Sequence, residues 1–488
     1  MKKLLRSVFL IGMSTVANTG VSVLRNKLLA VVLGPTGVGL FAQLFGLQTM
    51  AAGLVPLGLQ TGALRYIALY RNENPRKLAS FVGTASKLFL ALSVVATVLC
   101  LAFLHPIARW AVGDPIYTVL LIAPILGIPF LVQTQTWLTF VQAGLDVGSY
   151  SRALMLTSIA GIVVLAPLIL VWRLKGASLH LLVFAAVGWA IALWTARRSM
   201  TPEMRQDLAH APFDREAVAS LWHFGSANFL PFLLTISFPF VLRAQIVQDC
   251  GLRENGFYQA LFAISMQYLA IPLNAMTAYS FPRISQLREI DDINREVNHA
   301  TRVAVLFSAA GILLILLTRD LVSHALFSEN CLSAVPYFPV QMVGDLFKSV
   351  SFAIQLPLLP QGRYRARNVL ALIQYGTFAA VLFAFPARMR IWGAVWGHTL
   401  SWVAHFVSHM VYLHRTNGFR FSPENLRLLL TSLVAVVAVA VMPFPDLRWR
   451  AAGAGVALLW AVTSITREEV DKIVAIVRAR MGSGGGEA

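Results

Sequence analysis

Apolar residues gather in long blocks along this chain, and the blocks recur from one end to the other. Leu88–Leu104 with its flanks is one such block, and Val303–Leu317 is another. A helix needs about 20 apolar residues to cross a hydrocarbon core about 30 Å thick. The blocks lack the apolar–polar alternation of a barrel strand, so the pattern predicts membrane-spanning helices.

The blocks and the polar segments between them predict about fourteen helices. The expected ranges are 9–33, 38–69, 80–104, 116–144, 149–172, 177–195, 217–247, 256–281, 301–325, 334–360, 364–386, 391–413, 426–443 and 451–466. The longest polar stretch between helices is the linker 198–216. The last segment, 467–488, is polar and is expected to form a cytoplasmic tail. The fold class expected is therefore an all-α membrane protein.

The chain also repeats itself at a nearly constant offset. Three pairs of segments match: Gly39–Phe45 with Gly256–Phe262 at 217, Leu24-Arg25 with Leu242-Arg243 at 218, and Gly148–Tyr150 with Gly362–Tyr364 at 214. Six helices per half give both halves the same orientation, which makes this a parallel repeat. We expect one six-helix lobe at 1–197, a second at 217–415, and two additional helices within 416–466. Transporters commonly bind their substrates between such halves.

Composition agrees with a membrane protein and gives it an orientation. Of the 488 residues, 57% are hydrophobic and 13% charged, whereas soluble domains carry about 25% charged residues. The net charge of +18 would suggest nucleic acid for a soluble chain, but cytoplasmic loops of membrane proteins accumulate Lys and Arg. With the N-terminus inside, 25 of the 40 basic residues fall on the inner side and 9 on the outer side. We expect a multi-pass protein of a bacterial inner membrane, with both termini cytoplasmic and no nucleic-acid partner.

Six basic residues remain inside the expected spans. They are Arg25, Lys27, Arg65, Lys87, Arg243 and Lys348. A basic side chain at mid-bilayer costs about 2.5–3.5 kcal/mol, so six facing lipid would cost about 15–20 kcal/mol. Several of them must therefore face a wet cavity or a ligand. The deep spans hold one acid, Asp345, so the cavity should be positive and its cargo anionic.

Two of these bases lie on polar stripes at equivalent repeat positions. Arg25 follows Asn18 along one helix face, and Arg243 shares a face with Asn228 and Thr235. The repeat predicts that the two arginines face each other, and two guanidinium forks suit a pyrophosphate. The alternative is that both extend to the outer headgroups.

The remaining deep lysines and arginine have less defined roles. Lys27 points away from Arg25 around the helix, and extension to the headgroups suits it better. Arg65 and Lys87 lie toward the inner helix ends, where they would line the inner mouth of the cavity or bind inner headgroups.

A second polar stripe lies on the expected helix 334–360. It contains Gln341, Asp345, Lys348 and Gln355. Asp345 and Lys348 are three residues apart and can pair. The pair is either a static element of the helix bundle or a switchable pair that lines the cavity and couples transport to an ion.

Helix 391–413 carries His398, His405 and His409, which would either relay protons or pack between helices. The chain has no phosphate-binding loop, dinucleotide-binding turn, nucleophile elbow or metal-ligand spacing. We therefore expect no enzyme activity, no cofactor and no metal.

Three stretches carry a resemblance to a known family. Lys27–Gly39, Phe281–Ser285 and Val343–Lys348 resemble the Wzx-type polysaccharide (O-antigen) flippases of the multidrug/oligosaccharidyl-lipid/polysaccharide (MOP) exporter superfamily. Within it they are most similar to translocases for the lipid-linked repeat of enterobacterial common antigen. The resemblance implies alternating access between two lobes. It also implies an undecaprenyl-pyrophosphate-linked oligosaccharide as cargo, moved from the cytoplasmic to the periplasmic leaflet, with membrane lipids and a polysaccharide polymerase as partners.

The resemblance leaves three other functions open. Typical chains of this family have twelve helices, whereas lipid II flippases of the same superfamily carry two extra, as expected here at 426–443 and 451–466. A drug or cation antiporter would need buried acids, and a lone Asp345 beside Lys348 argues against it. A membrane glycosyltransferase or ligase would need large polar loops, which this chain lacks.

Overall fold

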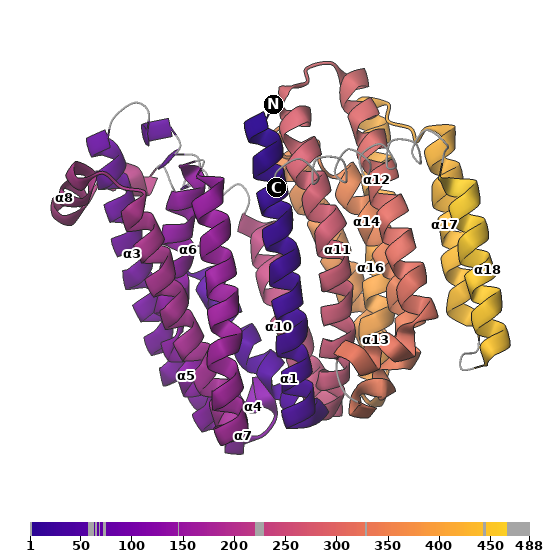
Figure 1. Ribbon diagram of the computed structural model, residues 1–488, viewed down its shortest axis with the longest axis horizontal. Helices are drawn as coiled ribbons and strands as arrows, with labels where there is room; N and C mark the ends of the chain where they lie inside the picture. Colours follow the sequence, from indigo (N-terminus) through magenta and orange to yellow (C-terminus); the bar gives the residue numbers. More distant parts are fainter. Residues whose placement is uncertain are drawn as a thin grey trace, which may run out of the picture. The chain divides into compact units, whose positions relative to one another are not determined.

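A computed structural model describes residues 2–56, 63, 66–67, 69–71, 75–144, 146–219, 229–326, 329–442 and 446–465. Within these ranges the regular structure is helical and no β-strand occurs (Figure 1). Eight of the described helices are long and apolar enough to cross a membrane, or nine if the bent pair within 252–286 forms one span. The expected all-α, multi-pass fold is confirmed, while the count of fourteen stays a prediction.

Two helices of the first half are each broken once. Helix α1 (Lys2–Leu54) is interrupted at Gly34, where φ is 66°, directly before Pro35. Helix α7 (Val147–Arg198) is interrupted at Arg173, where φ is 47°. Each break lies between two of the expected helices. The elements between α1 and α7 are α3 (Pro75–Ala102), α4 (Leu104–Val112), η1 (Pro115–Leu121), α5 (Ile122–Leu126) and α6 (Ile128–Ala143).

The second half repeats this order after α8 (Pro202–His210), a short helix in the polar linker. Its elements are α10 (Phe229–Cys250), α11 (Leu252–Gln286), α12 (Ile290–Leu317), α13 (Arg319–Leu326), η2 (Glu329–Tyr337), α14 (Phe338–Ile354), α15 (Tyr364–Ala384), η3 (Ala387–Met389) and α16 (Arg390–Asn417). Gly251, between α10 and α11, also has a positive φ of 98° and lies 217 residues after Gly34. The chain therefore turns from helix to helix at equivalent glycines in the two halves.

Two compact units emerge from the packing of these helices. The first comprises residues 1–267, 320–335 and 362–401, and the second comprises 268–319, 336–361 and 402–488. In the first unit α7 packs against α1 and α6, and α10 packs against α1, α4 and α15. The boundaries differ from those of the expected lobes, which stay a prediction.

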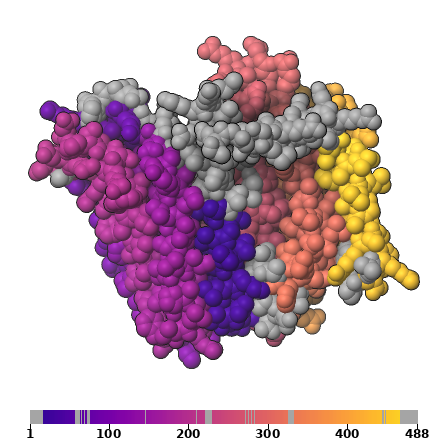
Figure 2. All heavy atoms as spheres, in the orientation of Figure 1, coloured from indigo at the N-terminus to yellow at the C-terminus, as the bar shows by residue number. Residues whose placement is uncertain are grey.

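The second unit contains the two additional helices, α17 (Pro423–Val441) and α18 (Leu447–Ser464). Both are helical as expected, and α12 contacts α14, α17 and α18. Figures 1 and 2 show α17 and α18 in yellow, side by side at the surface. The exposed side chains of α18 include Leu458, Leu459 and Val462, which suits a helix that faces lipid.

Helix α12 begins at Ile290, well before the expected start at 301. Its first three turns carry Asp291, Asp292 and Arg295 on one face, while Ile293, Val297 and Ala300 are buried on the other. Because this segment mixes charged and apolar residues, it forms an amphipathic helix that a pattern of uniformly apolar blocks does not predict.

The two copies of the repeated segment cross within the first unit. A Cβ atom built on Gly39 would lie 2.0 Å from the Leu252 carbonyl oxygen, and one built on Gly256 would lie 2.0 Å from the Pro35 carbonyl oxygen. Leu252 and Pro35 each precede the glycine of their own segment by four residues, so the contact is reciprocal. Asn255 Nδ2 donates to the Gly39 carbonyl oxygen at 2.8 Å. The absence of side chains at both glycines allows the helices to approach this closely.

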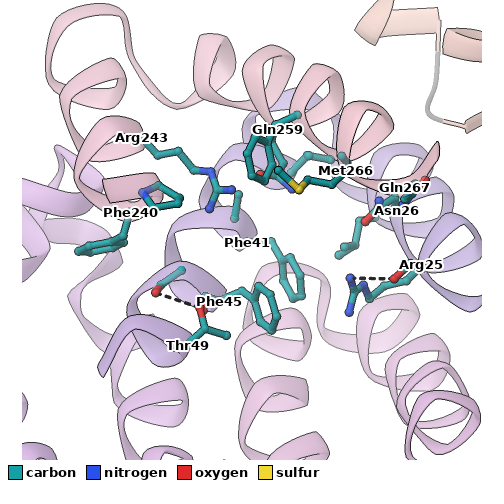
Figure 3. Close-up of a pocket in the computed structure, with 18 of the residues that line it drawn as sticks. Arg25, Asn26, Phe41, Phe45, Thr49, Phe240, Arg243, Gln259, Met266 and Gln267 are labelled. Carbon is teal, nitrogen blue, oxygen red and sulfur yellow. Dashed lines mark hydrogen bonds between the residues drawn. The ribbon is translucent and has the colours of Figure 1, made fainter. Parts of the chain in front are cut away.

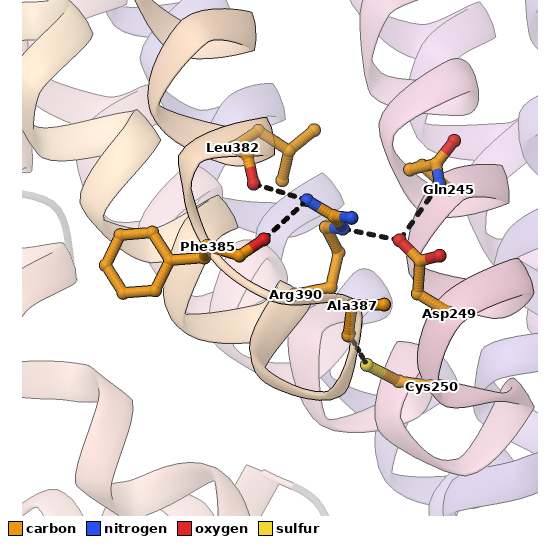
Figure 4. Close-up of polar contacts among 7 residues, drawn as sticks. All are labelled: Gln245, Asp249, Cys250, Leu382, Phe385, Ala387 and Arg390. Carbon is orange, nitrogen blue, oxygen red and sulfur yellow. Dashed lines mark hydrogen bonds and ion pairs between the residues drawn. The ribbon is translucent and has the colours of Figure 1, made fainter.

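An ion pair joins the end of α10 to the break between α15 and α16 (Figure 4). Arg390 Nε binds Asp249, and Arg390 Nη1 donates to the carbonyl oxygens of Leu382 at 2.6 Å and Phe385 at 3.0 Å. Gln245 Nε2 also donates to Asp249, at 2.9 Å. With side chains 8% and 15% exposed, the two partners are largely shielded, and the bonds to them fix this end of α10 within the first unit.

Candidate functional site

A cavity of about 350 Å³ lies inside the first unit (Figure 3). Its volume falls within the range of about 300–1,000 Å³ typical of small-molecule sites. Four helical stripes line it, from the two arms of α1, from α10 and from the beginning of α11. The stripes contain Ser22, Arg25, Asn26 and Leu29; Val38, Phe41, Ala42, Phe45, Gly46 and Thr49; Thr235, Ile236, Pro239, Phe240 and Arg243; and Gln259, Phe262, Ala263, Met266 and Gln267. Their spacing of three, four and seven or eight residues places each set on one helix face.

Arg25 enters the cavity from the first arm of α1. Its guanidinium carbon lies 5.6 Å from the ring centroid of Phe45, and Nη2 lies 3.5 Å from Ser22 Oγ. Its Nε is buried and has no hydrogen-bond partner in the described part of the chain. A guanidinium held on an aromatic face keeps its N–H groups free to donate in its own plane.

Arg243 enters from α10 and repeats this arrangement. Its guanidinium carbon lies 4.9 Å from the ring centroid of Phe262, the side chain is buried, and its Nε also has no partner among the described residues. Phe45 and Phe262 are the last residues of the two repeated segments, so both arginine–phenylalanine pairs occupy equivalent positions. The structure thus brings Arg25 and Arg243 to one cavity, as their repeat positions predict.

The charge of this cavity is positive. Its described lining contains two arginines and no Asp, Glu or Lys. On insertion scales two arginines in a span cost about 5–7 kcal/mol together, and each unpartnered buried donor adds about 1–3 kcal/mol. An anion that accepts hydrogen bonds from both guanidinium groups would offset these costs, and a phosphate group matches the guanidinium fork.

The other predicted residues of the first unit make contacts with the protein. Asn18 accepts a hydrogen bond from Ser158 Oγ at 2.6 Å. Lys27 Nζ donates to the His324 carbonyl oxygen at 2.5 Å. Lys87, which is exposed, donates to the Ala211 carbonyl oxygen at 2.9 Å. None of these three residues belongs to the described cavity lining. Arg65 and Asn228 lie outside the described residues.

The predicted stripe with Asp345 and Lys348 lies on α14, in the second unit. Gln341, Asp345 and Lys348 are buried, and Gln355 is half-buried at the end of this helix. Asp345 accepts a hydrogen bond from Tyr268 Oη at 2.8 Å, and Lys348 Nζ lies 5.8 Å from the ring centroid of Trp402. Both side-chain polar atoms of Gln341 lack a partner among the described residues. The coupling role of Asp345 stays a prediction.

His398, His405 and His409 of α16 are buried. The rings of His405 and His409 are tilted against each other with their centroids 4.0 Å apart, and His409 Nδ1 lies 2.8 Å from the His405 carbonyl oxygen. No group of three His, Cys, Asp or Glu side chains suitable for a metal ion occurs among the described residues.

Sequence reasoning missed four residues of these sites. Phe45 and Phe262 were available from the repeated segments, since each ends one copy. Gln259 lines the cavity. It lies within the second copy of the repeated segment, but at a position where the two copies differ. Tyr268, the partner of Asp345, gave no signal because it lies 77 residues away along the chain.

Comparison with known proteins identifies relatives over most of the chain. The family model described as polysaccharide biosynthesis protein matches residues 4–288, more than half of the sequence. A lipid III flippase from Escherichia coli (strain K12) is 25% identical over 80% of this chain and 94% of its own. A putative O-antigen transporter from Shigella flexneri is 22% identical over 76% of this chain and 87% of its own.

Solved structures share the fold. An inward-facing multidrug resistance MATE family transporter of the MOP superfamily aligns with a TM-score of 0.70 and 16% identity, over 85% of this chain and 98% of the other. The lipid II flippase MurJ in an inward closed conformation aligns with a TM-score of 0.67 and 12% identity, over 96% of this chain and 100% of the other. The comparisons together confirm the resemblance to polysaccharide flippases of this superfamily.

Proposed function

Because the chain belongs to the polysaccharide biosynthesis protein family, we propose that it is a flippase for a lipid-linked oligosaccharide. Its cargo would be an undecaprenyl-pyrophosphate-linked unit of the O-antigen or common-antigen type. The protein would move this unit from the cytoplasmic to the periplasmic leaflet of a bacterial inner membrane, by alternating access between two lobes. The named functions of the relatives support the general activity.

The observation that carries the proposal is the pair of repeat-equivalent arginines in one cavity. Arg25 and Arg243 each rest on a phenylalanine ring, and the Nε of each has no hydrogen-bond partner among the residues that the structure describes. A pyrophosphate has two anionic groups joined by one oxygen, so two guanidinium groups can each bind one phosphate. The lipid chain would remain in the bilayer, while the cavity would shield the charges of the pyrophosphate from the hydrocarbon core that opposes their crossing.

Arginine variants test this role. We expect Arg25→Ala and Arg243→Ala each to reduce flipping at least tenfold, since a hydrogen bond to a charged group contributes about 1.5–3 kcal/mol. Lysine at either position should restore part of the activity because it keeps the charge but loses the fork. The measurement is inward-to-outward movement of an undecaprenyl-pyrophosphate-linked sugar in proteoliposomes, at equal protein content.

Lys27→Ala is the matched control for these variants. Lys27 lies two residues from Arg25 but binds the His324 carbonyl oxygen and does not line the cavity. It should retain most of the activity. Wild-type flipping by both arginine variants would refute the proposal.

The orientation in the membrane is a separate proposal with its own test. The bias of 25 inner against 9 outer basic residues favours a topology in which the termini and the linker 198–216 are cytoplasmic. A thiol reagent that cannot cross the membrane should therefore label a cysteine introduced at position 253 in intact cells and miss one at position 205. The reverse labelling would show that the topology is inverted.

A lipid II flippase is the second candidate, because the alignment with MurJ covers 96% of this chain and so reaches the two additional helices. Depletion of the protein separates the two functions. Loss of a lipid II flippase blocks cell-wall synthesis and lyses cells. Loss of an O-antigen or common-antigen flippase should remove the surface glycan from viable cells, with the lipid-linked unit accumulating on the cytoplasmic side. A drug or cation antiporter is disfavoured by the two arginines in the cavity, which repel cations.

A further inference from the structure

The cavity offers an uncharged group whose chemistry differs from that of the arginines. Gln259 lines the cavity from α11 (Figure 3). Its Oε1 atom is buried, and no hydrogen bond reaches it from the residues that the structure describes. Buried acceptors without partners are rare in folded proteins, so such an atom calls for a donor from a ligand.

The hydroxyl groups of the lining are already committed to the protein. Thr49 Oγ1 donates to the Phe45 carbonyl oxygen at 2.8 Å, and Thr235 Oγ1 donates to the Pro231 carbonyl oxygen at 2.7 Å. Ser22 Oγ lies beside the Arg25 guanidinium. The amide oxygen of Gln259 therefore differs from the hydroxyl groups of this surface.

A diphosphate cannot satisfy this atom. In a lipid-linked sugar both phosphates are esterified and ionised at neutral pH, and they carry acceptors only. An amide oxygen requires an O–H or N–H donor. Sugar hydroxyl and acetamido groups supply such donors, and the sugar ring that carries them is attached to the second phosphate.

The repeat gives an independent reason to separate the two parts of the ligand. Arg25 with Phe45 corresponds to Arg243 with Phe262, and the two phosphates of a diphosphate are likewise equivalent in charge. Gln259, in contrast, corresponds to Ala42, which lines the same cavity. At this pair of positions only the second copy carries an amide, as expected for the side that faces the sugar.

We propose that Gln259 determines specificity for the first sugar of the cargo, by accepting a hydrogen bond from a hydroxyl or acetamido group next to the pyrophosphate. The inference rests on the proposed function, because it assumes a pyrophosphate between the two arginines. Gln267 lies eight residues further along the same face of α11, and Asn26 lies beside it in Figure 3.

Binding to matched short-chain probes tests the assignment. The reference probe is geranyl methyl pyrophosphate, a diester without a sugar. Three further probes replace the methyl group by glucose, galactose or N-acetylglucosamine and keep the same charge. Affinities are measured by calorimetry with the purified full-length protein in detergent, for the wild type and for Gln259→Ala, which installs the side chain of the equivalent Ala42.

We expect the wild type to bind at least one sugar probe more tightly than the methyl probe. Gln259→Ala should weaken that sugar probe about tenfold and leave the methyl probe unchanged. Lys27→Ala changes a side chain that binds the His324 carbonyl oxygen and lies outside the described cavity lining, so it should leave both affinities nearly unchanged.

Two results would overturn the inference in distinguishable ways. If no sugar probe binds more tightly than the methyl probe, or if Gln259→Ala weakens all probes equally, the sugar assignment fails while the flippase proposal stands. If Arg25→Ala and Arg243→Ala bind the methyl probe as tightly as the wild type, the pyrophosphate site fails, and the sugar assignment fails with it.

Discussion

Alanine at Gly39 is the sharpest test of the helix crossing that supports the cavity. The added Cβ would lie 2.0 Å from the Leu252 carbonyl oxygen and 2.8 Å from the Gly256 nitrogen. An unstrained carbon-to-oxygen contact is about 3.3 Å, so the second arm of α1 and the start of α11 must separate locally by about 1.3 Å. Both obstacles are backbone atoms, and no side-chain rotation can relieve the clash.

The expected cost follows from three contributions. Overpacking of this kind costs about 1–3 kcal/mol, and weakening the hydrogen bond from Asn255 to the Gly39 carbonyl oxygen adds about 0.5–1.5 kcal/mol. The higher helix propensity of alanine returns about 1 kcal/mol. The net destabilisation should be about 0.5–3.5 kcal/mol. Gly256→Ala should behave alike because its Cβ would meet the Pro35 carbonyl oxygen at 2.0 Å.

Thermal unfolding of the purified protein in detergent, followed by size-exclusion chromatography after heating, measures the effect. Gly20→Ala is the matched control, since it lies in the same helix α1 and its Cβ would have no neighbour within 4 Å. Gly39→Ala should unfold several degrees below the wild type, while Gly20→Ala should unfold at or above it. Equal midpoints for the two variants would show that the crossing does not depend on the absent side chain.

Two further changes test charged groups in the structure. Breaking the ion pair with Asp249 by Arg390→Gln should destabilise the protein by about 3–5 kcal/mol. The control Arg388→Gln, at an exposed position two residues earlier, should have little effect. Equal stability of the two variants in the same thermal assay would show that the ion pair does not stabilise the fold. On α14, the double change Asp345→Asn with Lys348→Gln removes both charges and should restore the folding that either single change impairs. If this pair exchanges partners during transport the double variant will be abundant but inactive in flipping, and full activity would rule out a transport role.

Hydrophobic patterning was sufficient to predict an all-α membrane protein and two of the places where its helices break. The expected gap at 34–37 coincides with Gly34 and Pro35, and the gap at 173–176 coincides with the positive φ of Arg173. These positions are visible in a sequence because polar or helix-breaking residues interrupt an apolar run. The start of α12 was missed because an amphipathic turn resembles a polar loop when only mean hydropathy is considered.

Sequence pattern likewise predicted one part of the polar contacts, while another part depends on long-range packing. The repeat predicted that Arg25 and Arg243 lie together, because equivalent positions near the axis that relates two halves face each other. This prediction requires no knowledge of side-chain packing. No comparable rule connects Asp249 with Arg390, which are 141 residues apart, and the sequence treated Arg390 only as an outer-loop charge. Its partner depends on how α10 packs against the break between α15 and α16, which local periodicity does not encode.

The reciprocal contact of Gly39 and Gly256 has the pattern of an isologous dimer interface, in which residue i of one subunit meets residue j of the other and j meets i. In such a dimer both subunits share one gene, and every substitution appears twice. Here the two copies lie in one polypeptide, so each can change alone. Asn255 illustrates this freedom: it donates across the crossing to the Gly39 carbonyl oxygen, while the equivalent position of the first copy holds Val38, which has no polar side chain. Covalent joining of the halves thus allows a symmetric framework to bind a cargo that has two different ends.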